Sequence, residues 1–203
     1  LLFPGGFLGV DVFFVISGFL ITTIIYRQLV DGSFSIFEFY IRRARRLLPA
    51  LFTVLIVTIP CAWFLFLPQE MIDFSHSILA TLFFYSNFLF YSEDPYWATA
   101  SELKPLLHTW SLAVEEQYYL IVPFLLLAIF KFIPDKIGIS LLGLGAISFA
   151  LAIVSTPANP EATFFLLPFR AWELLAGALT SIIVLHRKKD LPLWISSVVN
   201  PIA

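Results

Sequence analysis

The sequence contains little charge. Lys, Arg, Asp and Glu make up 13% of its 203 residues, whereas hydrophobic residues make up 60%. Soluble domains average about 25% charged and roughly 45 to 50% apolar residues. The composition therefore excludes an ordinary soluble domain and indicates an integral membrane protein. A formal net charge of -2 also gives no sign of a nucleic-acid partner, because such proteins carry a strongly basic surface.

Cysteine is nearly absent, since Cys61 is the single one in the chain. An internal disulfide is thereby excluded, and the apolar surroundings of Cys61 predict a small buried side chain without a redox role. The sequence also lacks His and Cys clusters with zinc spacing, phosphate-binding loops and dinucleotide-binding loops. No metal site and no permanently bound cofactor are predicted.

Long apolar runs are what the sequence has in abundance. A run of about 17 to 25 residues can cross the roughly 30 Å hydrocarbon layer as a helix. Five runs qualify, at 7–26, 47–67, 113–130, 137–154 and 164–185. A sixth run, 72–91, begins with polar residues, and its apolar part is short enough for an interfacial or re-entrant helix. The predicted fold class is an all-α, polytopic transmembrane helical bundle with one such helix.

The basic residues decide how these runs are arranged. Cytoplasmic loops carry an excess of Lys and Arg, which places the Arg42–Arg46 cluster on the inner side. If 72–91 does not span, Lys131, Lys136 and the cluster at 187–189 also fall inside. If it does span, all of these basic residues lie outside, against the rule. The first arrangement agrees with the rule, and we therefore predict that 68–110 is one external excursion.

This topology gathers polar groups near the outer ends of three helices. Ionisable side chains inside spans are costly, so such a layer is by default a candidate functional site. An alternative is a structural ion-pair girdle, with Arg170 bound to Glu115 or Glu116. The residues concerned are Asp11, His108, Trp110, Glu115, Glu116 and Arg170.

Four motifs resemble the bacterial membrane acyltransferase-3 family, in the family's order and across essentially the whole chain. They are Gly5–Thr22, Arg42–Pro49, Pro105–Tyr119 and Arg170–Gly177. The resemblance is greatest to the branch that O-acetylates O-antigen or other envelope glycans. It implies a multi-pass enzyme of the bacterial inner membrane. Such an enzyme transfers an acyl group, acetyl first of all, from cytoplasmic acyl-CoA to a hydroxyl of an extracytoplasmic glycan.

The resemblance also implies that residues 1–203 form only part of the family's transmembrane domain. Family members begin with a helix that carries a histidine regarded as catalytic, and this chain starts just after that helix. Further helices follow in the family, often with an SGNH hydrolase-like domain. We expect the fragment alone to be inactive.

The basic cluster would bind the donor. On a short cytoplasmic connection, the guanidinium groups of Arg42, Arg43, Arg45 and Arg46 could grip CoA phosphates in bidentate fashion. The family's Arg-x-Arg pair maps onto Arg43 and Arg45. Alternatively, the cluster only fixes topology and attracts anionic lipid.

On the outer side, the resemblance implies that Asp11 orients the missing histidine, although a carboxylate at a helix start can simply be satisfied by backbone amides. Glu115 and Glu116 point about 100 degrees apart on a helix, so at most one should face the site, and Glu116 is favoured. Arg170 and Glu173 share a helix face, where they could pair with each other or divide between substrate and scaffold.

The remaining candidates each have a functional and a structural interpretation. His108 could be an acid, a ligand for the acceptor sugar, or a loop residue capped by backbone. Trp110, Tyr118 and Tyr119 could stack on a sugar or sit at the membrane interface without function. The two small residues Ser17 and Gly18 form a notch in the middle of their helix. This notch at 17–18 permits close helix packing or passage of the pantetheine arm.

A transporter or flippase is the alternative function, because charges near mid-membrane can bind substrate without covalent chemistry. Transporters of this kind often show inverted repeats and broken helices near the midplane. Neither feature is evident in the sequence.

Overall fold

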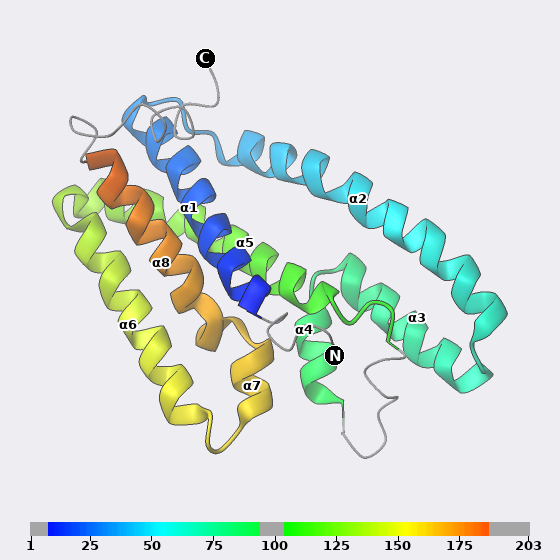
Figure 1. The fold of residues 1–203 in the computed structure, drawn as a ribbon. Helices are drawn as coiled ribbons and strands as arrows, with labels where there is room; N and C mark the ends of the chain where they lie inside the picture. Colours follow the sequence, from blue (N-terminus) through cyan, green and yellow to red (C-terminus); the bar gives the residue numbers. More distant parts are fainter. Residues whose placement is uncertain (1–7, 94–103, 187–203) are drawn as a thin grey trace.

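The computed structural model describes residues 8–93 and 104–186, and these residues form helices and turns without a β-strand. Figure 1 shows the arrangement of the helices. The long helices are α1 (Leu8–Val30), α2 (Ile36–Leu65), α5 (Thr109–Phe132), α6 (Ile137–Ser155) and α8 (Leu167–His186). The short helices are α3 (Pro68–Leu82), α4 (Ser86–Ser92), α7 (Pro160–Phe165) and the 3-10 turn Pro134–Lys136. The predicted all-α fold is confirmed.

Five stretches are long and apolar enough to cross a membrane, which agrees with the five predicted spans. They are Leu8–Val30, Ile36–Leu65, Thr109–Phe132, Pro134–Ser155 and Pro160–His186. The last is interrupted, because Leu166 between α7 and α8 has an extended backbone. Pro168 then lies in the first turn of α8, where its missing amide leaves no helical hydrogen bond unmade.

Helix α2 begins earlier than predicted. α1 ends at a tight turn in which Gly32 has a φ of 67° and the Ser33 amide donates to the Gln28 carbonyl at 2.9 Å. Ser35 then caps α2 by accepting the amide of Glu38 at 3.4 Å. The arginine cluster consequently lies inside α2, and its predicted place on a connection is wrong. A capped start and good helix formers such as arginine explain the extension.

The segment between α2 and α5 returns to the end of the bundle where it started. α3 and α4 are separated by Phe84, whose φ of 54° is left-handed and breaks the helix. The Thr81 and Thr109 hydroxyls lie 3.0 Å apart, and Ser86 Oγ donates to the Thr109 carbonyl at 2.9 Å. Both contacts place this segment at the start of α5. The described part of the predicted excursion therefore does not cross the bundle; residues 94–103 lie outside the described ranges.

Helix α8 packs between α1 and α6, and α5 packs against α1 (Figure 1). The α1–α8 contact depends on two glycines. A Cβ on Gly18 would lie 1.9 Å from the Leu174 carbonyl oxygen, and one on Gly177 would lie 1.9 Å from the Val15 carbonyl oxygen. The close-packing reading of the notch at 17–18 is thus confirmed for Gly18.

Helix α2 diverges from α1 along its length (Figure 1) and packs mainly on α3. This pair forms a second core with the turn that precedes α5, and its buried residues are Leu51, Leu55, Ala62, Phe74 and Leu106. Cys61 is exposed on α2, so the prediction that it is buried is wrong. An exposed apolar side chain on a spanning helix faces lipid, which composition alone could not distinguish from burial.

Candidate functional site between α1, α2 and α5

A cavity of about 270 Å³ lies between α1, α2 and α5. Each helix contributes side chains spaced three or four residues apart, the spacing of one helix face. The lining residues are Phe13, Ile16, Ser17, Leu20 and Ile21 of α1, Arg43, Arg46, Leu47 and Ala50 of α2, and Leu112, Glu115, Glu116 and Tyr119 of α5. A mostly apolar wall with a few convergent polar groups is typical of a small-molecule site.

Three polar side chains meet at one wall of this cavity. Glu115 Oε1 accepts hydrogen bonds from Ser17 Oγ and from the Tyr119 hydroxyl, and these two hydroxyls also contact each other. Ser17, Glu115 and Tyr119 are only 5%, 6% and 3% exposed. A carboxylate buried in a spanning helix requires such donors. We call these three residues the Ser17 network.

Only part of this network could be predicted from the sequence. Glu115 and Tyr119 are four residues apart, and such residues meet on one helix face. Ser17 was predicted only as one of the two small residues at 17–18, and nothing marked it as a partner of Glu115, because a serine in an apolar helix commonly bonds to its own backbone. Its partner lies on another helix, 98 residues further along the chain.

Two of the four predicted donor-binding arginines reach the cavity. Arg43 and Arg46 line it, and the Arg43 guanidinium lies 4.8 Å from the centroid of the Tyr119 ring. Arg42 points elsewhere and bonds to Glu38 at 3.1 Å and to Gln28 at 3.3 Å. Arg45 is exposed and is not among the lining residues. The spacing that reaches the cavity is thus i, i+3, and not the Arg-x-Arg spacing.

The predicted separation of inner arginines from outer carboxylates is wrong, because both kinds of residue line one cavity. At 1.5 Å per residue, Arg43 lies about 10 Å from the start of α2 and Arg46 about 15 Å. Glu115 likewise lies about 9 Å from the start of α5. α2 starts at the end of the bundle where α1 ends, and α5 starts at the opposite end, so both sets of residues lie inside the bundle, where the Arg43 guanidinium meets the Tyr119 ring at 4.8 Å.

Both adjacent glutamates line the cavity, so the prediction that at most one does so is also wrong. The cavity has α1 on one side and α2 on the other, which makes it wider than a single face of α5. Glu115 is held by the hydroxyls of Ser17 and Tyr119. Glu116 accepts no hydrogen bond from any residue that the structure describes, so its oxygens remain available.

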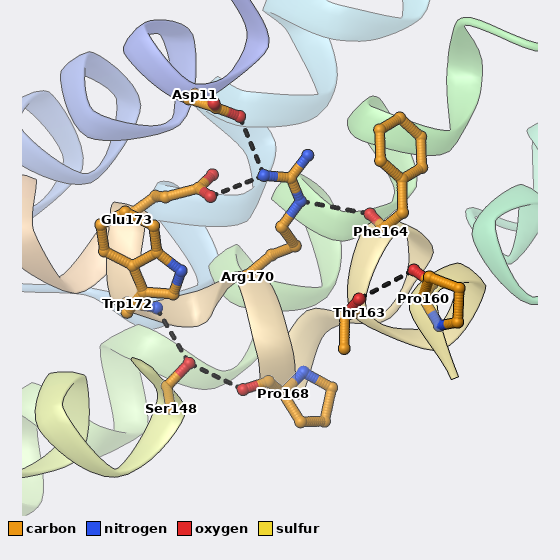
Figure 2. A network of polar contacts seen from close by, with 9 residues as sticks. All are labelled: Asp11, Ser148, Pro160, Thr163, Phe164, Pro168, Arg170, Trp172 and Glu173. Carbon is orange, nitrogen blue, oxygen red and sulfur yellow. Dashed lines mark hydrogen bonds and ion pairs between the residues drawn. The ribbon is translucent and has the colours of Figure 1, made fainter. Parts of the chain in front are cut away.

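A second polar cluster lies nearer the starts of α1 and α8 (Figure 2). Arg170 Nη1 donates to Asp11 Oδ1 at 2.9 Å and to Glu173 Oε1 at 2.7 Å, and Nε donates to the Phe164 carbonyl at 3.2 Å. Glu173 is buried, and within the described residues its Oε2 has no partner. Arg170 thus pairs with Asp11 and Glu173, and the predicted girdle to Glu115 or Glu116 does not form.

Aromatic rings enclose the guanidinium of this second cluster. It lies 5.6 Å from the Trp110 ring centroid and 5.2 Å from that of Phe164. The nearby α8 start is tied to α6 through Ser148, whose hydroxyl donates to the Pro168 carbonyl and accepts the Trp172 amide (Figure 2). We call Asp11, Arg170 and Glu173 the Arg170 cluster.

The three aromatic residues predicted to contact a sugar are buried. Trp110 packs between Phe14, Phe164 and Arg170, and Tyr119 lies under Arg43. Tyr118 is also in the core. Trp110 and Tyr118 are not among the residues that line the cavity, and Arg43 covers the ring of Tyr119, so the sugar-stacking interpretation is not supported. Their burial could not be predicted from the sequence, because aromatic residues suit both cores and interfaces.

His108 lies just before the first residue of α5. Its side chain is exposed and forms no hydrogen bond with any residue that the structure describes. Its predicted role as an acid or sugar ligand stays a prediction. No group of three His, Cys, Asp or Glu in residues 8–93 and 104–186 is placed to hold a metal ion.

The chain matches the acyltransferase domain family over residues 2–200. It is 36% identical over 179 residues to the peptidoglycan O-acetyltransferase OatA of Listeria monocytogenes, covering 85% of this chain and 29% of that protein. It is 36% identical over 152 residues to the O-acetyltransferase OatA of Staphylococcus aureus strain NCTC 8325, covering 74% of this chain and 25% of that protein.

A protein of Staphylococcus aureus strain COL, provisionally named an O-acetyltransferase, is 35% identical over 205 residues, covering 98% of this chain and 34% of that protein. The chain therefore spans about a third or less of the length of these relatives. No solved structure matches it. The family match extends over nearly the whole chain and agrees with the four motifs. The chain belongs to the acyltransferase domain family, the membrane acyltransferase-3 family that those motifs resemble.

Proposed function

We propose that the protein transfers an acetyl group from acetyl-CoA to a hydroxyl of a cell-envelope glycan, from a place in the bacterial cytoplasmic membrane. The observation that supports this most is the cavity, where two guanidinium groups and two carboxylates converge among apolar walls. Such a site can bind an anionic donor and assist proton transfer. The family match favours this chemistry over the transporter alternative.

In this proposal the donor binds at the α2 wall. Arg43 and Arg46 offer charge-assisted hydrogen bonds to phosphate or carbonyl oxygens of acetyl-CoA. Arg42 and Arg45 are exposed near the same end of α2. In this proposal they bind anionic lipid headgroups instead of the donor. The apolar wall suits the pantetheine arm and the acetyl methyl group.

The acceptor approaches from the Arg170 cluster. Acyl transfer to a hydroxyl needs a group to hold the proton and donors to hold the developing oxyanion. The Asp11 side chain is 30% exposed and is the most open carboxylate of this cluster. It either orients a histidine from another part of the full-length protein or binds the acceptor sugar, with Arg170 fixing its position.

The acceptor is proposed to be peptidoglycan in preference to O-antigen, because the Listeria relative is named for the former. An SGNH-like domain beyond this chain, where present, would receive or pass on the acetyl group. Both points rest on the relatives and on family resemblance.

The test uses the full-length protein in membranes with labelled acetyl-CoA and, in separate arms, peptidoglycan or O-antigen. We expect label in peptidoglycan and a loss of about a hundredfold or more in Asp11→Ala, the range of a lost acid-base or orienting group. Transfer at the full rate by Asp11→Ala would remove that residue from the mechanism. Absence of label from both glycans would overturn the proposed function.

A further inference from the structure

We propose that Ser17 carries the acetyl group transiently as an ester between the donor thioester and the glycan hydroxyl. This rests on the proposed function and adds a covalent site to it. A nucleophilic hydroxyl is recognised by a base within hydrogen-bond reach and by a third group that orients the base. The Ser17 network contains all three parts.

The contacts assign one role to each residue. Ser17 Oγ donates to Glu115 Oε1, so its proton already points at the group that would accept it. The Tyr119 hydroxyl donates to the same oxygen and holds the carboxylate in place. Arg43 lies against the Tyr119 ring, and Arg46 lines the same cavity. Positive charge is therefore available for the oxyanion that forms when a carbonyl is attacked.

Ser17 differs from the other buried hydroxyls of its helix. Thr22 and Thr23 are equally buried, but neither lines the cavity, and Thr23 bonds to Ser181 at 2.7 Å. Ser17 alone among these three contacts a carboxylate and faces the cavity. A buried hydroxyl that served only packing would need neither feature.

The position of Ser17 also suits a relay. Asp11 lies six residues earlier on α1, about 9 Å along the helix, while Arg43 and Tyr119 adjoin the same network. Ser17 thus lies between the donor wall and the acceptor end. With the acetyl group held on Ser17, CoA can leave before the glycan enters, and the cavity never has to hold both.

Two balanced steps follow. In the first, Ser17 Oγ attacks the thioester carbonyl while Glu115 takes the hydroxyl proton, the C–S bond breaks, and the departing thiolate receives that proton from Glu115. In the second, the glycan hydroxyl attacks the Ser17 ester while Glu115 takes its proton. The C–Oγ bond then breaks, and Ser17 Oγ regains the proton.

The experiment uses the full-length protein in lipid nanodiscs with labelled acetyl-CoA and no glycan. A covalent intermediate predicts exchange of label between acetyl-CoA and free CoA, and an acetyl group on the peptide that contains Ser17. We expect Ser17→Ala to lower this exchange by about a thousandfold or more, as loss of a nucleophile does. Glu115→Gln should lower it by about a hundredfold.

Two further variants control for folding. Thr22→Val removes a neighbouring buried hydroxyl outside the cavity and should leave exchange unchanged. Ser17→Cys keeps a nucleophile of similar size, and its acetyl adduct should be released by neutral hydroxylamine, which cleaves thioesters and spares oxygen esters.

The outcomes separate this proposal from the proposed function. Acetylated glycan without exchange and without an acetylated Ser17 peptide would overturn the relay and leave the function standing. Full glycan acetylation by Ser17→Ala, or acetyl found on another residue, would overturn it as well. If the wild-type protein acetylates no glycan and shows no exchange, the proposed function fails too.

Discussion

At the scale of single residues, the Arg170 cluster has two carboxylates for one guanidinium. Arg170 Nη1 is shared between Asp11 and Glu173, and Glu173 is 1% exposed. Removing one partner of a buried ion pair leaves an uncompensated charge, which is more damaging than losing the pair as a whole. The arginine is therefore the member on which the other two depend.

Arg170→Ala is expected to destabilise the protein by about 3 to 5 kcal/mol, the usual cost of leaving a buried charge unpaired. Arg170→Ala combined with Glu173→Gln should recover much of that loss, because the double variant removes the orphaned charge. The measurement is thermal unfolding in one fixed detergent, arranged as a double-mutant cycle. A double variant no more stable than Arg170→Ala alone would contradict this account of the cluster.

At the scale of helices, the α1–α8 contact is set by backbone approach. Gly18 and Gly177 each face a carbonyl oxygen of the other helix at a distance that no Cβ tolerates. Because the obstructing atoms belong to the backbone, a side-chain rotation cannot relieve the clash. The two helices would have to separate, and α8 carries Arg170 and Glu173 with it.

Gly18→Ala and Gly177→Ala are each expected to lower stability by at least about 1 to 3 kcal/mol, the cost of overpacking. The matched control is Gly143→Ala on α6, where a Cβ would meet nothing within 4 Å. That change should be neutral or slightly stabilising, since alanine is the better helix former. Equal unfolding temperatures for Gly18→Ala and Gly143→Ala would show that α1 and α8 are not so closely packed.

At the scale of the whole molecule, polar contacts tie together elements at each end of the bundle. At one end, Asn159 Nδ2 donates to the Tyr91 hydroxyl at 3.1 Å, which joins the α6–α7 connection to α4. At the other end, Tyr26 on α1 contacts His186 on α8. The positive-inside rule assigns the first end to the outside and the second to the cytoplasm.

Cysteine labelling in intact cells tests this orientation. In a Cys61→Ala background, single cysteines at Ser92 and Ala158 should react with an impermeant thiol reagent. Cysteines at Ser33 and Lys136 should react only after the cells are opened. All four side chains are exposed. The side of the membrane on which each cysteine lies, and not its burial, therefore decides whether the reagent reaches it. Labelling of Lys136→Cys from outside would invert the proposed orientation.

The sequence predicted the large features of the fold because they follow from length and hydrophobicity. The five spans and the returning segment were read from apolar runs and basic loops, and Arg170 and Glu173 were placed on one face by their spacing. Helix ends were harder to predict, because a cap such as Ser35 or a left-handed residue such as Phe84 depends on local backbone geometry.

The candidate site was predicted only in its residue types. Periodicity tells which residues share a face, but it does not tell how far two helices are offset along their axes. The meeting of Arg43 with Tyr119, and of Ser17 with Glu115, depends on that offset. The Arg-x-Arg motif similarly pointed to Arg45, whereas the helical register of α2 turns Arg46 into the cavity.

The central claim is that the cavity between α1, α2 and α5 binds the donor, and paired arginine variants test it most directly. The measurement is the KM for acetyl-CoA in glycan acetylation by the full-length protein, for Arg43→Ala/Arg46→Ala and for Arg42→Ala/Arg45→Ala. Hydrogen bonds to charged groups contribute about 1.5 to 3 kcal/mol, so the first variant should raise KM by roughly tenfold or more. The second variant, with the same change in charge, should stay close to wild type. An equal rise in both, or a rise only in the second, would contradict the account.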